Sequence, residues 1–149
     1  MHRIFAVILC AIGLLIGPDA IGGGGEAKDE MKKLEGTWVV QTANFSGKEL
    51  PAAKGGAGSK MEFKGERIHT SAFGGQEQDL IYRIDPSKNP KTMNFAHLGE
   101  KARANEPGEI GQAIYELKGD SLTICIGPPD RRPTAFGQKG TATIVLKRQ

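Results

Sequence analysis

Side chains able to act as nucleophiles, general bases or metal ligands are sparse in this sequence. His2 and Cys10 lie within the first 21 residues, which leaves His69, His97 and Cys125 in the rest of the chain. The sequence contains no Gly-x-Ser-x-Gly or His-Glu-x-x-His motif, and these three residues lack the close spacing of zinc motifs. The sequence therefore predicts no catalytic residues, no metal site and no cofactor.

Several polar side chains occur within apolar, alternating segments, where they could hold a small molecule. The hydroxyl-bearing candidates are Thr42, Thr70, Tyr82 and Tyr115. A few polar groups on an apolar lining are typical of a ligand pocket, although the same hydroxyls can instead form hydrogen bonds within a filled core. His97 is in phase with Met93 and Phe95, so it faces the interior or the mouth, either as a ligand contact or as a structural histidine. Both interpretations stay open for the whole set.

Strands are the elements that must position these candidates. From Gly36 onward, short runs with period-two alternation are separated by Gly, Pro, Asn and Asp. The expected strands are Gly36–Asn44, Ser59–Lys64, Arg67–Phe73, Gln76–Ile84, Lys91–His97, Ile110–Lys118, Ser121–Ile126 and Thr141–Arg148. Ala27–Leu34 has good helix formers and no breaker, which predicts one short helix with Met31 and Leu34 turned toward the core. The predicted fold is all-β, an eight-stranded antiparallel up-and-down barrel with one short N-terminal helix.

Alternation also predicts which side chains face the barrel interior. The inward set is Trp38, Val40, Thr42, Met61, Phe63, Ile68, Thr70, Ala72, Leu80, Tyr82, Ile84, Met93, Phe95, His97, Ala113, Tyr115, Leu117, Leu122, Ile124, Ile126, Ile144, Leu146 and Arg148. Closing the barrel makes the first and last strands neighbours. We therefore expect the guanidinium of Arg148 to lie over the indole of Trp38 and to seal one end.

Two groups of residues resemble a known family. Leu34-Glu35-Gly36-Thr37-Trp38, with Lys147-Arg148 in the last strand, resembles the Gly-x-Trp entry of lipocalin-like barrels. The segment from Ile114 to Cys125, the Arg132-Pro133-Thr134-Ala135-Phe136 run and the Asp85-Pro86-Ser87-Lys88 turn are similar to an uncharacterised lipocalin-like domain family abundant in planctomycete bacteria. The resemblance covers Leu34 to Arg148. It implies a barrel and a bacterial, exported setting, and brings no established activity.

The first residues have the layout of a secretory signal. Arg3 supplies a positive start, an apolar run extends from Ile4 to Ile16, and Pro18 interrupts it. This run is shorter than a membrane span requires, so we expect no stable membrane span in the mature protein. The expected organisation is a signal peptide over residues 1–21, a flexible segment and short helix over 22–33, and the barrel domain over 34–149. The expected location is periplasmic or extracellular.

The net charge of the chain and the motifs that it contains favour some classes of function over others. A net charge of +3, dispersed among acids, gives little reason to expect binding to nucleic acid. The leading hypothesis is non-enzymatic binding of a small, partly apolar ligand inside the barrel. The alternative is a structural or protein-interaction module with a filled barrel, whose loops Ala53–Ser59 and Gly127–Gly140 make the contacts. Enzyme activity ranks third because no residues support it.

Overall fold

The computed structural model describes residues 24–72, 75–97, 111–128 and 130–149. It consists of one helix, one 3-10 turn and nine strands over that part of the chain. In chain order they are α1 (Gly24–Leu34), β1 (Gly36–Phe45), β2 (Lys48–Glu49), a 3-10 turn (Ala52–Lys54), β3 (Lys60–Lys64), β4 (Arg67–Thr70), β5 (Gln78–Asp85), β6 (Lys91–His97), β7 (Gly111–Lys118), β8 (Ser121–Ile126) and β9 (Ala142–Arg148). None of the described helices is long and apolar enough to cross a membrane.

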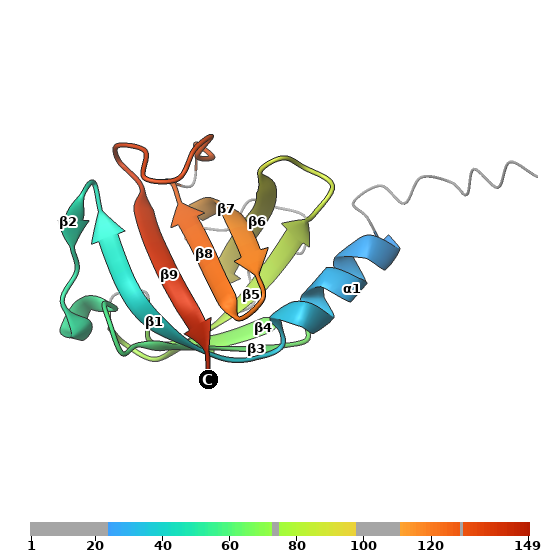
Figure 1. The fold of residues 1–149 in the computed structure, drawn as a ribbon, viewed down its shortest axis with the longest axis horizontal. Coiled ribbons are helices and arrows are strands. Elements are labelled where there is room, and N and C mark those ends of the chain that lie inside the picture. The colour runs from blue at the N-terminus through green and yellow to red at the C-terminus, as the bar shows by residue number, and fades with distance from the viewer. Residues whose placement is uncertain (1–23, 73–74, 98–110, 129) are drawn as a thin grey trace, which may run out of the picture.

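The strands form a closed antiparallel barrel with up-and-down topology, as predicted. Sequential neighbours pair from β3 to β9, β1 pairs with β3, and the additional β1–β9 pairing closes the sheet. The two-residue strand β2 pairs only with the end of β1, so eight strands make the barrel. The C-terminal end of α1 lies beside the end of β9 and the start of β1 (Figure 1). The helix therefore covers the end of the barrel at which the chain terminates.

Several predicted boundaries were wrong by a few residues. The helix begins at Gly24 instead of Ala27, and β2 and the 3-10 turn were not predicted. Strand β4 ends at Thr70 because the Thr70 hydroxyl accepts the Ala72 N–H, at 2.9 Å, and turns the chain. Phe73, the predicted end of that strand, lies outside the described residues.

The predicted inward position of Thr42 was also wrong. The β1–β9 register shifts between Val40 and Thr42, which is a β-bulge. A bulge inserts one residue into a strand and moves the following side chains to the opposite face. Ala43 is consequently buried, with 1% of its surface exposed, whereas Thr42 faces solvent.

Most of the other predicted inward residues form a single hydrophobic core. Trp38, Tyr82, Tyr115, Phe63 and Phe95 are its largest side chains, and each is at most 2% exposed. The helix contributes Leu34, which is fully buried, and Met31, which packs against the core in part. Both residues are turned toward the core, as predicted. Burial of these aromatic and aliphatic side chains stabilises the barrel. The described residues include only one cysteine, Cys125, so no disulfide links them.

A second buried cluster lies outside the barrel wall. Ile114 and Cys125 point outward from β7 and β8, yet they are at most 1% exposed and lie opposite each other in register. The connection between β8 and β9 covers them: the Cys125 thiol lies 3.7 Å from the Ala135 carbonyl oxygen. Arg132 fastens this connection to the sheet, donating to the carbonyl of Ala113 at 2.6 Å and to the side-chain oxygen of Asn94 at 2.6 Å.

This arrangement predicts that Cys125 is protected from thiol reagents until the connection lifts. Arg132→Ala removes charge-assisted hydrogen bonds, each worth roughly 1.5–3 kcal/mol, so it should raise the modification rate by about tenfold or more. Arg131→Ala is the matched control, since Arg131 is exposed. Modification by a chromogenic disulfide in native buffer measures both rates. Equal acceleration by the two variants would contradict the pinning role of Arg132.

Candidate functional site

The helix-covered end of the barrel is built around Trp38 and Arg148. The two residues are paired in register across β1 and β9, and the guanidinium carbon lies 4.3 Å from the centre of the indole ring. Trp38 is fully buried. The alternation of inward side chains predicts this cation–π contact, and it places the guanidinium at the end of the barrel as a seal.

The same two side chains donate hydrogen bonds to carbonyls at the C-terminal end of α1 and just after it. The indole Nε1 of Trp38 donates to the Leu34 carbonyl at 2.8 Å, and Arg148 donates to the carbonyls of Glu35, at 2.7 Å, and Lys33. The last carbonyls of a helix have no partner within it, and its C-terminus carries partial negative charge that a cation stabilises. Trp38 and Arg148 therefore fix both the position and the direction of α1 against the barrel.

Glu30 also connects α1 to the barrel, through hydrogen bonds with residues of β6 and β7. Its side chain is 7% exposed, and its carboxylate accepts hydrogen bonds from the Lys91 ammonium at 2.7 Å and from the Tyr115 hydroxyl at 3.3 Å. Burial raises the pKa of Glu30, but the hydrogen bond and charge of Lys91, the charge of Lys33 and the Tyr115 hydroxyl together outweigh it, so the net pKa lies below the usual value. Glu30 is therefore ionised and paired at neutral pH.

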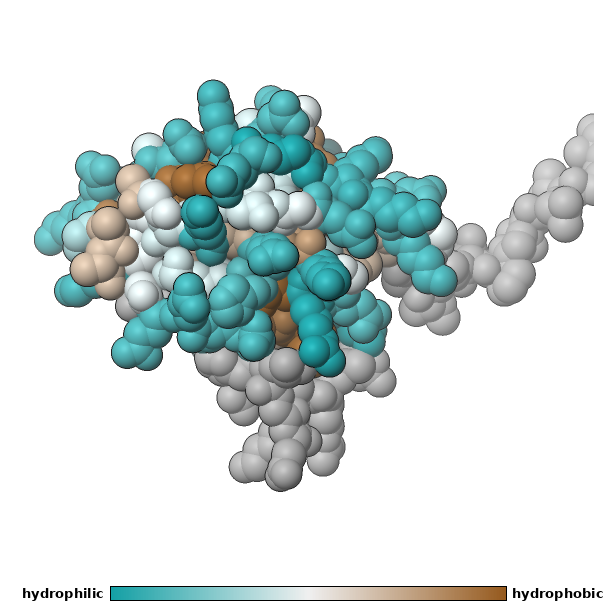
Figure 2. All heavy atoms as spheres, turned by 90° about the horizontal axis from the view of Figure 1, so that it is seen from below, coloured by the Kyte–Doolittle hydropathy of each residue, from teal (hydrophilic) through white to brown (hydrophobic). Residues whose placement is uncertain are grey.

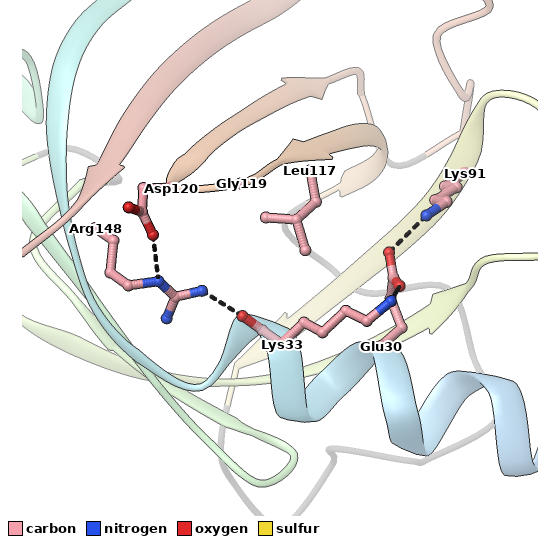
Figure 3. A pocket seen from close by; sticks show the side chains of 7 residues that line it. All are labelled: Glu30, Lys33, Lys91, Leu117, Gly119, Asp120 and Arg148. Atoms are coloured by element: carbon pink, nitrogen blue, oxygen red, sulfur yellow. Dashed lines mark hydrogen bonds and ion pairs between the residues drawn. The ribbon is translucent and has the colours of Figure 1, made fainter.

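A groove opens between α1 and the β7–β8 hairpin. It has a volume of about 430 Å³, and its lining includes Glu30, Lys91, Asp120 and Arg148, with the side chain of Leu117 between them (Figure 3). Every cation shown there already has partners: Lys91 and Lys33 with Glu30, and Arg148 with helix carbonyls and with Asp120, whose carboxylate lies 3.3 Å from its Nε. None of these three cations is therefore free to pair with an anion that enters the groove.

Glu30 and Lys91 were missed in the sequence analysis. The missed signal is helical spacing: Ala27, Glu30, Met31 and Leu34 occupy positions i, i+3, i+4 and i+7, which lie on one face of a helix. A glutamate on that apolar face indicates a buried carboxylate that needs a partner. The partner itself was not visible, because Lys91 is brought to Glu30 only by the closing of the barrel.

The structure separates the five predicted ligand-binding residues. Thr42 faces solvent, and the side chain of His97 is not among those described. Thr70 is buried, but its hydroxyl donates to the Lys60 carbonyl at 2.8 Å and accepts from Ala72. Tyr115 is buried and donates to Glu30. Of the three hydroxyls that are buried, those of Thr70, Tyr82 and Tyr115, only that of Tyr82 has no hydrogen-bond partner among the described residues.

Tyr82 lies in the barrel interior with an unsatisfied hydroxyl. The residue is 1% exposed, and its phenolic oxygen has no hydrogen-bond partner among the described residues. Its ring packs edge-on against Phe63, with centroids 5.2 Å apart and planes at 87°. Burial, followed by the charges of Glu35 and Glu66, raises the pKa of Tyr82 well above its usual value, so the hydroxyl is protonated and can donate.

His69 is part of an exposed cluster on the outer face. Its Nδ1 lies 2.8 Å from a carboxylate oxygen of Asp79, and its Nε2 lies 3.6 Å from Glu77. With Glu62, Lys64 and Arg67 it borders a hollow of about 440 Å³. The described residues contain no group of three or more metal-ligating side chains placed to hold an ion, and this cluster is half-exposed and internally paired.

The contacts of His69 predict how its pKa and its contribution to folding stability depend on its neighbours and on pH. The hydrogen bond to Asp79 raises the pKa of His69 above 6.5, further aided by the charges of Asp79 and Glu77. A raised folded-state pKa stabilises the fold below the unfolded-state value, and this contribution disappears as pH rises through the folded-state value. NMR titration should find the His69 pKa above 6.5, and Asp79→Asn should bring it back toward that value. An unchanged pKa in Asp79→Asn would rule out the pairing.

Family models, curated proteins and solved structures give no match to this chain. The geometry of the barrel interior and of its helix-covered end is therefore the basis for assigning a function.

Proposed function

We propose that this barrel binds a small, partly apolar ligand in its interior and catalyses no reaction on it. The observation that carries the proposal is the Tyr82 hydroxyl, which is buried and unpartnered among the described residues. A buried polar group without a partner costs roughly 1–3 kcal/mol, and most such groups in folded proteins are satisfied. A ligand atom that accepts this hydrogen bond would remove that penalty.

The surroundings of Tyr82 define the rest of the ligand. The core cluster around the barrel interior is aromatic and aliphatic, with Phe63 packed directly on the Tyr82 ring. The other interior hydroxyls, of Thr70 and Tyr115, are already engaged. One polar anchor in an apolar lining is the combination that orients a small, mostly apolar molecule.

A filled barrel that acts as an interaction module is the alternative, favoured by the many large side chains that are at most 2% exposed. Its surface is less suited to that role. Phe45 is the only large hydrophobic side chain that the described residues expose, and Gly55 and Gly56 in one proposed contact loop are buried. Seen from below, the described residues present a largely hydrophilic surface, with apolar atoms in small areas between polar side chains (Figure 2). Interaction patches are usually larger and more apolar.

Extraction of the protein purified from its native host tests the proposal. Solvent extraction followed by mass spectrometry should recover the same small molecule from independent preparations. Tyr115→Trp, which enlarges an interior side chain, should greatly reduce the amount recovered. Ile81→Trp, on the outward-facing neighbour of Tyr82, is the control and should retain the ligand. Repeated extraction that yields nothing from a folded protein would favour the filled barrel.

We also propose that the protein is exported, and that it is related to the lipocalin-like family it resembles. Both proposals depend on sequence features, and residues 1–21 lie outside the described residues. Mass spectrometry of the protein from its native host should find a mature N-terminus near Ala20 or within Gly22–Gly25. A mature species that begins at Met1 would contradict export through a cleaved signal.

A further inference from the structure

We propose that the ligand is a neutral molecule bearing a hydrogen-bond acceptor, such as an ester or ketone, and that the barrel excludes the corresponding carboxylate. This inference depends on the proposed function, because it specifies the chemistry of the molecule bound in the same interior. Two features of the structure carry it: the kind of polar group that Tyr82 offers, and the charge of the groups around it.

Tyr82 offers a donor. Its phenol is buried against Phe63, and burial, followed by the charges of Glu35 and Glu66, keeps the pKa of the phenol high. A neutral phenol donates one hydrogen bond, so the missing partner is an acceptor on the ligand, about 2.7 Å away in a normal O–H···O geometry.

The charge around the interior is unfavourable to an anion. Among the buried side chains of the described residues, the one that is ionised is Glu30, which is negative. The half-buried cations are already committed: Lys91 to Glu30, Arg148 to helix carbonyls, and Arg132 to carbonyls of β6 and β7. A carboxylate guest would have to lose its hydration without gaining a free cation, and such a transfer is strongly unfavourable. An uncharged carbonyl has no comparable penalty.

Matched probes test this discrimination. Methyl decanoate, decanoate and undecane have similar apolar chains and differ in the polar group: an ester, a carboxylate and none. Their affinities for the full mature protein can be measured at neutral pH by displacement of the neutral dye N-phenyl-1-naphthylamine, with titration calorimetry as a check. Methyl decanoate should bind at least about tenfold more tightly than decanoate.

Tyr82→Phe isolates the hydrogen bond. The substitution should lower the affinity for methyl decanoate by roughly three- to tenfold, which is the effect of one neutral hydrogen bond. The affinity for undecane should not change. The variant removes an unpartnered hydroxyl and keeps the ring, so it is expected to fold. Tyr115→Phe is the control: it removes a hydroxyl already bonded to Glu30 and should leave the ester-to-undecane affinity ratio unchanged.

The outcomes separate the two proposals. Decanoate binding as tightly as the ester, or an unchanged ester affinity in Tyr82→Phe, would overturn the neutral-acceptor inference and leave interior binding intact. Failure of all three probes to bind or to displace the dye would overturn interior binding of an apolar ligand, and this inference with it.

Discussion

Replacing Trp38 by alanine is expected to lower the free energy of unfolding by roughly 3–5 kcal/mol, the usual effect of deleting a fully buried Trp. Trp38 is 0% exposed, and its indole also donates to the Leu34 carbonyl at 2.8 Å. The substitution therefore removes a large apolar contact and leaves the end of α1 without one of its hydrogen bonds. Urea denaturation followed by far-ultraviolet circular dichroism measures the change.

Arg148→Ala is the matched comparison on the partner strand. Its cation–π contact with Trp38 is worth about 0.5–2 kcal/mol. Its side chain is 30% exposed, so water can reach the carbonyls that it leaves behind. We expect Arg148→Ala to destabilise the protein clearly less than Trp38→Ala. Equal losses, or a Trp38→Ala loss below about 1 kcal/mol, would contradict the placement of Trp38 at the centre of the sealed end.

Gly55→Ala should be the next most damaging change, with a loss of roughly 2–5 kcal/mol from backbone strain and overpacking together. Gly55 has φ +90°, and a Cβ at this position would lie 2.0 Å from the carbonyl oxygen of Ala72. That neighbour is backbone, so the 3-10 turn and the chain after β4 would have to separate. Chemical denaturation gives the free energy.

Gly58→Ala separates the two contributions. Gly58 also has φ +90°, but a Cβ there would meet nothing within 4 Å. Its loss should therefore be only the left-handed backbone strain, about 1–2 kcal/mol. If both variants lose the same amount, the close approach of Gly55 to Ala72 contributes nothing.

The alternation of apolar and polar residues along the strands was sufficient to predict the barrel. Met61 and Phe63 on β3, and Leu122 and Ile124 on β8, follow a strict inward–outward pattern that a one-residue slip would reverse. The same pattern placed Trp38 on β1 opposite Arg148 on β9. Pairings of this kind follow from period two and from closure, and both can be derived from the sequence.

The features that could not be predicted depend on contacts between distant segments. Thr42 turned outward because of a bulge that its own sequence does not mark. Ile114 and Cys125 are buried because the β8–β9 connection folds back over the outer face. The hydroxyl of Tyr115 bonds to Glu30, 85 residues away in the chain. Periodicity within a strand contains no information on such contacts.

We propose that the barrel interior holds a ligand at Tyr82, and a high-resolution crystal structure of the protein purified from its native host tests this most directly. We expect electron density of a non-protein molecule within hydrogen-bond distance of the Tyr82 hydroxyl, extending among the apolar side chains of the core. An interior filled by its own side chains, with the Tyr82 hydroxyl bonded to a water molecule or to the protein, would contradict the claim.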